Sequence, residues 1–301
     1  MEKITYAGWQ NCYRLANDWV DLVVTGDVGP RVLRFGFVGE ANEFIEIDSN
    51  LGKTGGDEWR MYGGHRLWHA PEMLGRTAIP DNNPVQVTAT PEGLRVCQPT
   101  EPLTGIKKEM VIALTPDEPN VTVIHRLYNR GLWPLELAPW ALSVMTSGGT
   151  AILPLPPRGA HDDHLEPTST IALWAYTDLT DPRWTWGKQY IFLRQDERVR
   201  QPQKLGIANP EGWIAYANHG NLFVKTTNYV PNATYPDHGC SAEVYTEGHL
   251  IELETLAPLT RLAPGAYVEH IERWFLFRDV PLPRSDADVD QTILPLVNSL
   301  N

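Results

Sequence analysis

Short runs of β-branched and aromatic residues, separated by Gly, Pro, Asn and Asp, follow one another along almost the whole chain. Residues 121–128 alternate, with Val121, His125 and Leu127 on one face and Thr122 and Arg126 on the other. This period of two predicts β-strands. Similar runs lie at 18–26, 31–39, 42–48, 83–90, 93–99, 106–115, 120–129, 188–195, 211–218, 221–229, 241–248, 249–258 and 267–279.

Helical periodicity is scarce. A short helix is expected near the C-terminus, where Val289, Ile293, Val297 and Leu300 recur at spacings of three and four around Pro295. The Pro-rich stretch 153–167 predicts a long loop. We therefore expect an all-β chain whose strands are too numerous for one open sheet and stack as two sheets. No linker or repeat divides it, so residues 1–301 are expected to form a single domain.

Charge and cysteine content narrow the partners and the compartment. The formal net charge is −12, so a polyanion such as nucleic acid is not an expected partner. No stretch approaches the roughly 20 apolar residues of a membrane helix, and no membrane partner is expected. The start shows no secretory pattern, and Cys12, Cys97 and Cys240 are an odd number at scattered spacings. Reduced thiols in the cytoplasm are the expectation.

Aromatic content adds a weak indication of function. The chain has 11 tryptophans and 11 tyrosines. Most are expected in the core of a wide sheet interface, and some are expected to stack on sugar rings.

Two carboxylates stand out in residues 249–255. On a strand, His249, Ile251 and Leu253 share one face, and Glu252 and Glu254 share the other. A solvated face is the ordinary explanation. The apolar flanks favour a central strand, where two like charges raise at least one pKa and produce a general base near neutrality.

Residues 63–72, "GGHRLWHAPE", are the densest group of functional side chains. Three readings remain open here. His65 and His69 have the spacing of two metal ligands on a helix, although the glycines and the proline leave little room for one. Alternatively Trp68 packs in the core and the polar residues join a loop to the sheet. In the third reading Arg66 holds a substrate group, an imidazole transfers a proton, and Glu72 orients it.

Two motifs carry a family resemblance. The segment "LETLAP" at 253–258, followed by "RLAPG" at 261–265 and a closing strand, resembles the C-terminal signature of the galactose mutarotase (aldose 1-epimerase) superfamily. The hairpin at 23–44 resembles the opening of that fold. The resemblance implies a mostly antiparallel β-supersandwich with a sugar cleft on one sheet.

The same resemblance implies roles for individual residues. The catalytic base of the family falls on Glu254, or on Glu252 if the match slips by two positions. The family's general acid, a histidine, is expected near 137–145, where this chain has "LAPWALSVM" and Trp140 instead. The chain departs from the family there, and we expect His65 or His69 to replace the missing acid.

Other polar residues are assigned to the cleft with less support. Lys225 and Lys204 interrupt apolar strands. Edge protection is the ordinary explanation of such lysines, and a contact to an acidic sugar in the cleft is the alternative. Tyr235 and His238 precede the glutamate strand and are expected at the rim of the cleft. The cluster His161 to His164 reads as a solvated loop.

Three functions follow from these residues. The first is an epimerase-like isomerase that acts on a sugar, with Glu254 as base. The others are a glycoside hydrolase or polysaccharide lyase on the same fold and a carbohydrate-binding protein without catalysis. No cofactor or metal is assigned.

Overall fold

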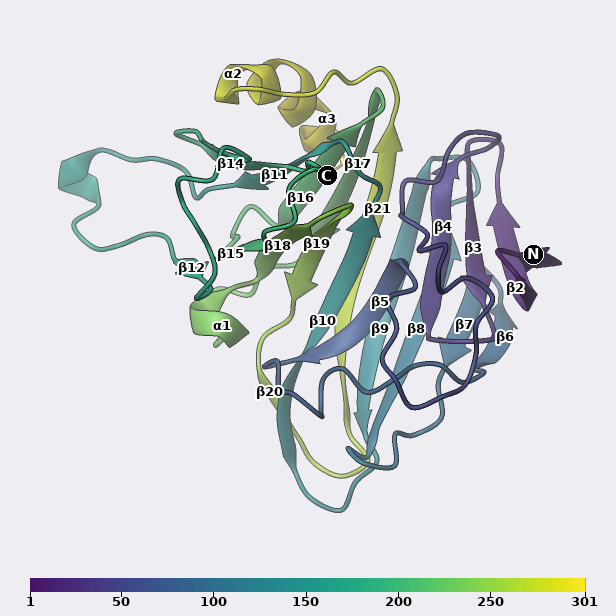
Figure 1. Ribbon diagram of the computed structural model, residues 1–301. Coiled ribbons are helices and arrows are strands. Elements are labelled where there is room, and N and C mark those ends of the chain that lie inside the picture. Colours follow the sequence, from purple (N-terminus) through teal and green to yellow (C-terminus); the bar gives the residue numbers. More distant parts are fainter. Residues whose placement is uncertain (301) are drawn as a thin grey trace.

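The computed structural model describes residues 1–300 and contains two antiparallel β-sheets stacked face to face (Figure 1). The first sheet has 11 strands, in the order β1-β2-β3-β4-β5-β10-β19-β18-β15-β12, with β20 paired to β10. The second has 10 strands, in the order β13-β14-β11-β16-β17-β21-β9-β8-β7-β6. The prediction of an all-β architecture in stacked sheets is confirmed.

The strands of the first sheet are β1 (Glu2–Tyr6), β2 (Trp9–Ala16), β3 (Val20–Thr25), β4 (Arg31–Phe37), β5 (Gly64–Ala70), β10 (Leu135–Met145), β12 (Ile171–Leu173), β15 (Gln203–Ile207), β18 (Ala242–Glu247), β19 (Leu250–Leu256) and β20 (Thr260–Leu262). Those of the second are β6 (Gln86–Thr90), β7 (Gly93–Cys97), β8 (Ile106–Leu114), β9 (Asn120–Asn129), β11 (Thr150–Pro154), β13 (Trp184–Trp186), β14 (Tyr190–Arg194), β16 (Trp213–Asn218), β17 (Asn221–Thr227) and β21 (Tyr267–Phe277).

The main core lies between the sheets and takes side chains from both. Ile251 and Leu253 of β19 belong to the same hydrophobic cluster as Val121 and Val123 of the second sheet. On β9 every second residue is buried, as the alternation predicted. β19 lies between β10 and β18, so the prediction of a central strand is also confirmed.

The C-terminal helix forms in three short pieces, α2 (Asp286–Asp288), the π-helical η2 (Val289–Ile293) and α3 (Leu294–Asn298). Pro295 stands in the first turn of α3, where its missing N–H is tolerated. Val289, Ile293 and Val297 pack on the outer side of the second sheet. The expected helix is thus confirmed, and the proline sets where its last piece begins.

One predicted strand is wrong, and the sequence missed several strands that form. Residues 42–48 form only isolated bridges at Phe44 and Glu46, because the Asn42 side chain bonds the backbone of Leu33, Phe35 and Phe44 and shapes a turn. β10 was not predicted, although it is one of the two longest strands. Its residues are apolar on both faces, and such a run shows no alternation.

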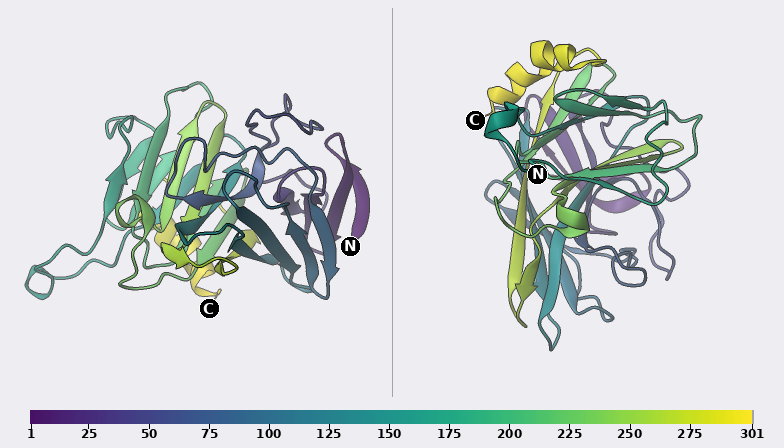
Figure 2. Two further views of the ribbon diagram at one scale, coloured as in Figure 1. Left: turned by 90° about the horizontal axis from the view of Figure 1, so that it is seen from below. Right: turned by 90° about the vertical axis from the view of Figure 1, so that its left-hand side faces the viewer.

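The long loop predicted at 153–167 runs from the end of β11 to β12 and contains only η1 (His161–Asp163). It projects from one end of the molecule (Figures 1 and 2). One short helix remains, α1 (Pro236–Gly239). Cys12, Cys97 and Cys240 are buried and carry free thiols. None of the helices within residues 1–300 is long and apolar enough to cross a membrane.

Candidate functional site

Four neighbouring strands, β5, β10, β19 and β18, carry most of the residues that the sequence singled out. Arg66 is paired with Leu142, Leu142 with Glu254, and Glu254 with Glu243. Paired residues of antiparallel strands point to the same face of the sheet. These side chains therefore share the outer face, opposite Ile251 and Leu253, which point into the core between the sheets.

A pocket of about 250 Å³ opens on this outer face. Its walls are mainly aromatic and its polar groups are mainly carboxylates, and both gather on the four strands and on the loops beside them. It is lined by Trp59, Met61, Arg66, Trp68, Glu72, Trp140, Leu142, Tyr176, Lys204, Tyr245, Glu247, Glu252 and Glu254. The structure thus brings together six residues singled out from sequence, namely Arg66, Glu72, Trp140, Lys204, Glu252 and Glu254.

Ion pairs organise the floor of the pocket. Lys204 Nζ lies 3.0 Å from Glu254 Oε2 and 2.8 Å from Glu243 Oε2. Trp140 Nε1 donates a hydrogen bond of 2.8 Å to the same Glu254 Oε2. Glu254 Oε1 is buried and has no hydrogen-bond partner among residues 1–300. One oxygen of Glu254 is therefore held by two donors, while the other is held by none.

A second ion pair joins Arg66 to Glu252. Arg66 Nη2 donates to Glu252 Oε1 at 3.0 Å, and the guanidinium lies 4.4 Å from the centre of the Trp68 ring. Burial raises the pKa of Glu252, although the Arg66 charge acts in the opposite direction. A carboxyl group in this position keeps its proton to a higher pH than a solvated glutamate.

Lys204 is the central cation of the site. Burial acts against its charge, but Glu243 and Glu254 outweigh burial and raise the pKa of Lys204 well above its ordinary value. The ammonium also lies 4.6 Å from the Trp140 ring and 4.7 Å from the Trp174 ring. Burial raises the pKa of Glu243 well above that of a solvated glutamate. Lys204 is therefore a fixed positive charge among carboxylates.

The structure does not bring His65 or His69 to Glu254, which corrects the expectation that one of them is the acid of the pocket. The segment 64–70 is a strand, so Arg66 and Trp68 face the pocket while His65 and His69 face the other way. The helix that a metal-binding pair at this spacing needs does not form. The dense motif serves two separate faces of the sheet.

His69 is buried and lines a different hollow, of about 510 Å³, together with Met73, Leu103 and Glu136. Neither of its ring nitrogens has a hydrogen-bond partner in the part of the chain that the structure describes. Burial, with the charge of Lys108 nearby, lowers the pKa of His69 to about 4. The imidazole is therefore neutral at physiological pH.

His65 belongs to a polar network buried between the two sheets. Its Nε2 lies 2.7 Å from His125 Nε2, and its Nδ1 lies 2.8 Å from Ser143 Oγ. His125 Nδ1 donates to the backbone oxygen of His270, which can only accept. His125 Nε2 must then accept from His65 Nε2–H, and Ser143 donates to His65 Nδ1. All of these hydrogen bonds can therefore form while the imidazole rings of His65 and His125 are both neutral.

Lys225 and Glu272 form the ion pair of this network. Lys225 Nζ lies 2.7 Å from Glu272 Oε1, and Trp274 Nε1 donates to Glu272 Oε2 at 2.7 Å. Thr255 donates to Glu272 Oε1 and lies 2.7 Å from His270 Nε2. Lys225 is therefore placed in the interior and not in the pocket, contrary to the expectation from sequence, because it points inward from β17.

The donor atoms of His65, His125 and Glu272 lie within 4.8 Å of one another. The two imidazole nitrogens are 2.7 Å apart, a hydrogen-bond distance, whereas two nitrogen ligands of tetrahedral zinc are about 3.3 Å apart. Lys225 also places a positive charge on Glu272. We therefore assign these residues to proton sharing and not to metal coordination.

The remaining candidates lie away from the pocket. Tyr235 is buried, and its hydroxyl accepts a hydrogen bond from the backbone of Val230. His238 is exposed in α1 and does not line the pocket. His161 is exposed beside Asp162, as expected of a solvated loop.

Several pocket residues were not assigned from sequence. Tyr245 and Glu247 follow Glu243 at intervals of two in β18, and this alternation beside the glutamate strand was an available signal. Trp59 and Tyr176 reach the pocket from loops, where no periodic pattern points to a site.

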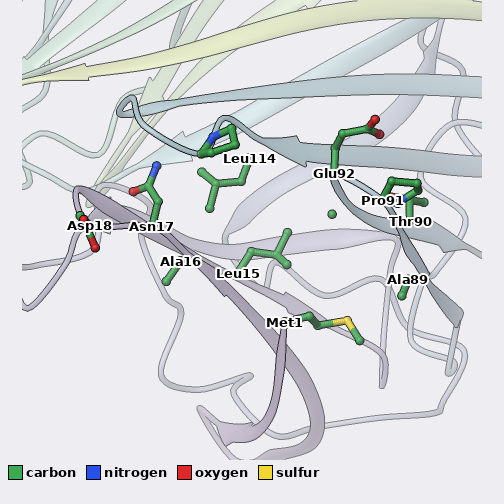
Figure 3. A pocket seen from close by; sticks show the side chains of 12 residues that line it. Met1, Leu15, Ala16, Asn17, Asp18, Ala89, Thr90, Pro91, Glu92 and Leu114 are labelled. Atoms are coloured by element: carbon green, nitrogen blue, oxygen red, sulfur yellow. The ribbon is translucent and has the colours of Figure 1, made fainter.

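Another hollow, of about 400 Å³, lies at the edge of the sheets beside Leu15, Asn17 and Leu114 (Figure 3). Its side chains are mostly apolar or small, and Asp18 and Glu92 are the ionisable side chains among the described residues that line it. It contains none of the residues proposed from sequence. We therefore take the outer-face pocket as the candidate site.

No protein-family model matches the chain, and no curated protein matches it in sequence. Solved structures do match over most of its length. A candidate aldose 1-epimerase from Escherichia coli K12 is 14% identical, with a TM-score of 0.57, over 89% of this chain and 99% of that one. The chain has the galactose mutarotase-like fold.

Two further structures with this fold agree. A galactose mutarotase-like protein from Lactobacillus casei is 10% identical, with a TM-score of 0.57, over 89% of this chain and 100% of its own. A candidate mutarotase from Salmonella typhimurium is 10% identical, with a TM-score of 0.58, over 89% and 90% of the two chains. The resemblance read from two sequence motifs is thus confirmed for the mutarotase-like fold.

Proposed function

We propose that the outer-face pocket binds a sugar and that the protein is an isomerase of the aldose 1-epimerase type. One observation carries the proposal. On the mutarotase-like fold, Glu252 and Glu254 point from one strand into a pocket walled by Trp59, Trp68 and Trp140. Indole faces pack against the C–H faces of sugar rings, and carboxylates bind hydroxyls and transfer protons.

Glu254 is the proposed base. Oε2 is held by Lys204 and Trp140, so the unpartnered Oε1 takes the proton from the anomeric hydroxyl. As that proton leaves, the C1–O1 bond becomes a carbonyl and the bond from C1 to the ring oxygen breaks. The ring oxygen then takes a proton from an acid. After rotation about C1–C2, the reverse steps close the ring as the other anomer.

Glu252 is the proposed acid, in place of the histidines suggested by the sequence. Burial raises its pKa, so it holds a proton more firmly than a solvated glutamate. Two residues along a strand span about 6.8 Å, which is comparable to the width of a sugar ring. Arg66 fixes one oxygen of Glu252 and positions the group.

Glycoside hydrolysis is the second candidate function, and the pair of carboxylates on one strand face favours it. Glycosidases use two carboxyl groups that flank the scissile bond, and Glu252 and Glu254 both line this pocket. Hydrolysis yields shorter sugars and epimerisation yields the other anomer, so product analysis distinguishes the two reactions.

The test is NMR measurement of anomer exchange across a panel of aldoses, with analysis of oligosaccharides for cleavage. Replacement of a positioned base lowers a rate by about 10²–10⁴-fold, so we expect Glu254→Gln to lose turnover to this extent and to keep sugar binding. The exposed and distant Glu211→Gln is the matched control. Sugar binding without anomer exchange or cleavage, with Glu254→Gln changing affinity alone, would leave a binding protein instead.

A further inference from the structure

The pocket contains more carboxylates than cations. The inference from this excess names the class of sugar that the pocket binds, and it therefore rests on the proposed function. Four glutamates line the pocket and Glu243 lies behind Lys204, against two cations, Arg66 and Lys204. Both cations are already paired, Arg66 with Glu252 at 3.0 Å and Lys204 with Glu243 and Glu254. Even with Glu243 and Glu252 protonated, negative charge is in excess.

Glu72 and Glu247 hold the excess charge at the mouth of the pocket. Both are exposed, and neither forms an ion pair with any residue that the structure describes. At the floor, the buried Glu254 Oε1 also lacks a partner. Within residues 1–300, carboxylate oxygens thus remain available as hydrogen-bond acceptors at the mouth and at the floor of the pocket. Neither of the two pocket cations is free to bind an anionic group of a ligand.

The aromatic walls add to this preference. Trp59 and Tyr176 are 39% and 42% exposed, and Tyr245 lies beside them in the pocket. Aromatic faces attract cations, and two of the pocket's tryptophans, Trp68 and Trp140, already contact the side chains of Arg66 and Lys204. Burial raises the pKa of Tyr176 to about 12, and the charges of Glu254 and Glu72 act in the same direction.

We propose that the pocket selects a sugar that carries a protonated amino group. Its ammonium lies at the mouth, between the open carboxylates Glu72 and Glu247 and the aromatic side chains, while the ring occupies the space above Glu254. Uronates and sugar phosphates are disfavoured, because the glutamates of the pocket outnumber its two cations, Arg66 and Lys204, even when Glu252 carries a proton.

The experiment measures dissociation constants by isothermal titration calorimetry at pH 6.5 and low salt. The panel is galactosamine and glucosamine, the matching neutral and N-acetylated sugars, glucuronate, glucose 6-phosphate and tetramethylammonium. We expect an amino sugar to bind about tenfold more tightly than its neutral and N-acetylated counterparts, equivalent to about 1.4 kcal/mol. The ratio should fall toward one in 1 M salt, where screening acts within about 3 Å.

The double variant Glu72→Gln, Glu247→Gln locates the preference. Both side chains are exposed, so folding is expected to survive, and the unfolding midpoint checks this. The ratio of the two dissociation constants should fall toward one in the double variant and stay near ten in Glu211→Gln. An unchanged ratio in the double variant would overturn the inference.

The other outcomes separate this inference from the proposed function. If neutral sugars bind and exchange anomers with no preference for the amino group, the inference fails and the proposed function stands. Tighter binding of glucuronate or glucose 6-phosphate also overturns the inference alone. If tetramethylammonium binds and competes but no sugar binds, the proposed function fails with it, and the pocket is a site for organic cations.

Discussion

Lys204 is the residue on which the candidate site depends most. It is 5% exposed, and it neutralises Glu243 and Glu254, which are fully buried. Removal of one partner from a buried ion pair leaves an uncompensated charge and costs about 3–5 kcal/mol. We therefore expect Lys204→Met to lower the free energy of unfolding by about this amount in urea titrations.

A double variant provides the internal check. Adding Glu243→Gln to Lys204→Met removes one of the two stranded carboxylates and should restore part of the lost stability. The exposed Lys188→Met should change the free energy of unfolding by less than about 0.5 kcal/mol. A Lys204→Met protein as stable as the Lys188→Met protein would show that the glutamates are not held by this ammonium.

At the scale of single residues, the sequence predicted correctly that the two glutamates share one face, and it misplaced the histidines. Glu252 and Glu254 were assigned to one face because they alternate with Ile251 and Leu253, which are apolar. Residues 65–69 show no such contrast between faces. Whether they formed a loop, a helix or a strand could not be decided locally, and that decision determines which way each imidazole points.

Strand β5 begins with a glycine that its surroundings require. Gly64 has a φ of +70°, and a Cβ there would lie 2.2 Å from the backbone oxygen of Val32. Gly39 has a similar φ of +79°, but a Cβ there meets nothing within 4 Å. An alanine would be strained by the positive φ at either position, but it would clash with a neighbour only at position 64. The two substitutions therefore separate backbone strain from steric overlap.

We expect Gly64→Ala to lower the free energy of unfolding by at least about 2 kcal/mol more than Gly39→Ala, as measured in urea. Sugar affinity should fall as well, because Arg66 lies two residues further along β5. Equal losses in the two variants would mean that the neighbouring strand β4 adjusts to the added methyl group.

Among the elements, the strands that coincide with runs of β-branched and aromatic residues were predicted, whereas β1, β2, β5 and β10 were not. β10 is buried along nearly its whole length and contains Pro139, so it offers neither alternation nor a clear strand signal. Yet β10 joins β5 to β19 and thereby completes the pocket. The pairing of strands that lie far apart in sequence is not encoded in any local pattern.

At the scale of the whole molecule, the buried polar network joins the two sheets. His65 comes from the first sheet, and His125, His270, Glu272 and Lys225 come from the second. Burial lowers the pKa of His65 and His125, and lowers that of His270 to about 3. The folded protein thus keeps three imidazoles neutral that the unfolded chain protonates below about pH 6.5.

These shifts set the pH dependence of stability. Because the unfolded chain binds more protons, the contribution is complete above about pH 6.5 and is lost as the pH falls toward 3. Glu272, whose pKa the Lys225 charge and the histidines hold down against burial, loses its contribution in the same direction. We expect the free energy of unfolding to fall between pH 6.5 and 4.

The variant His270→Gln tests this contribution. It should flatten the slope by up to about 1.4 kcal/mol per pH unit, since one proton fewer is taken up on unfolding. The exposed His249→Gln should leave the slope as it is. Parallel pH profiles for His270→Gln and the unaltered protein would exclude a neutral buried imidazole at this position.

The alternation along β5, β10, β19 and β18 has a practical consequence for protein engineering. Positions that face the pocket, such as Trp68, Leu142 and Tyr245, take turns with positions that face the core. A combinatorial library restricted to the half-buried pocket positions Trp68 and Tyr245 would vary ligand contacts while the core side chains and the buried ion pairs stay unchanged. New specificities could then be selected by directed evolution with less loss of folded protein than if the buried positions were varied too.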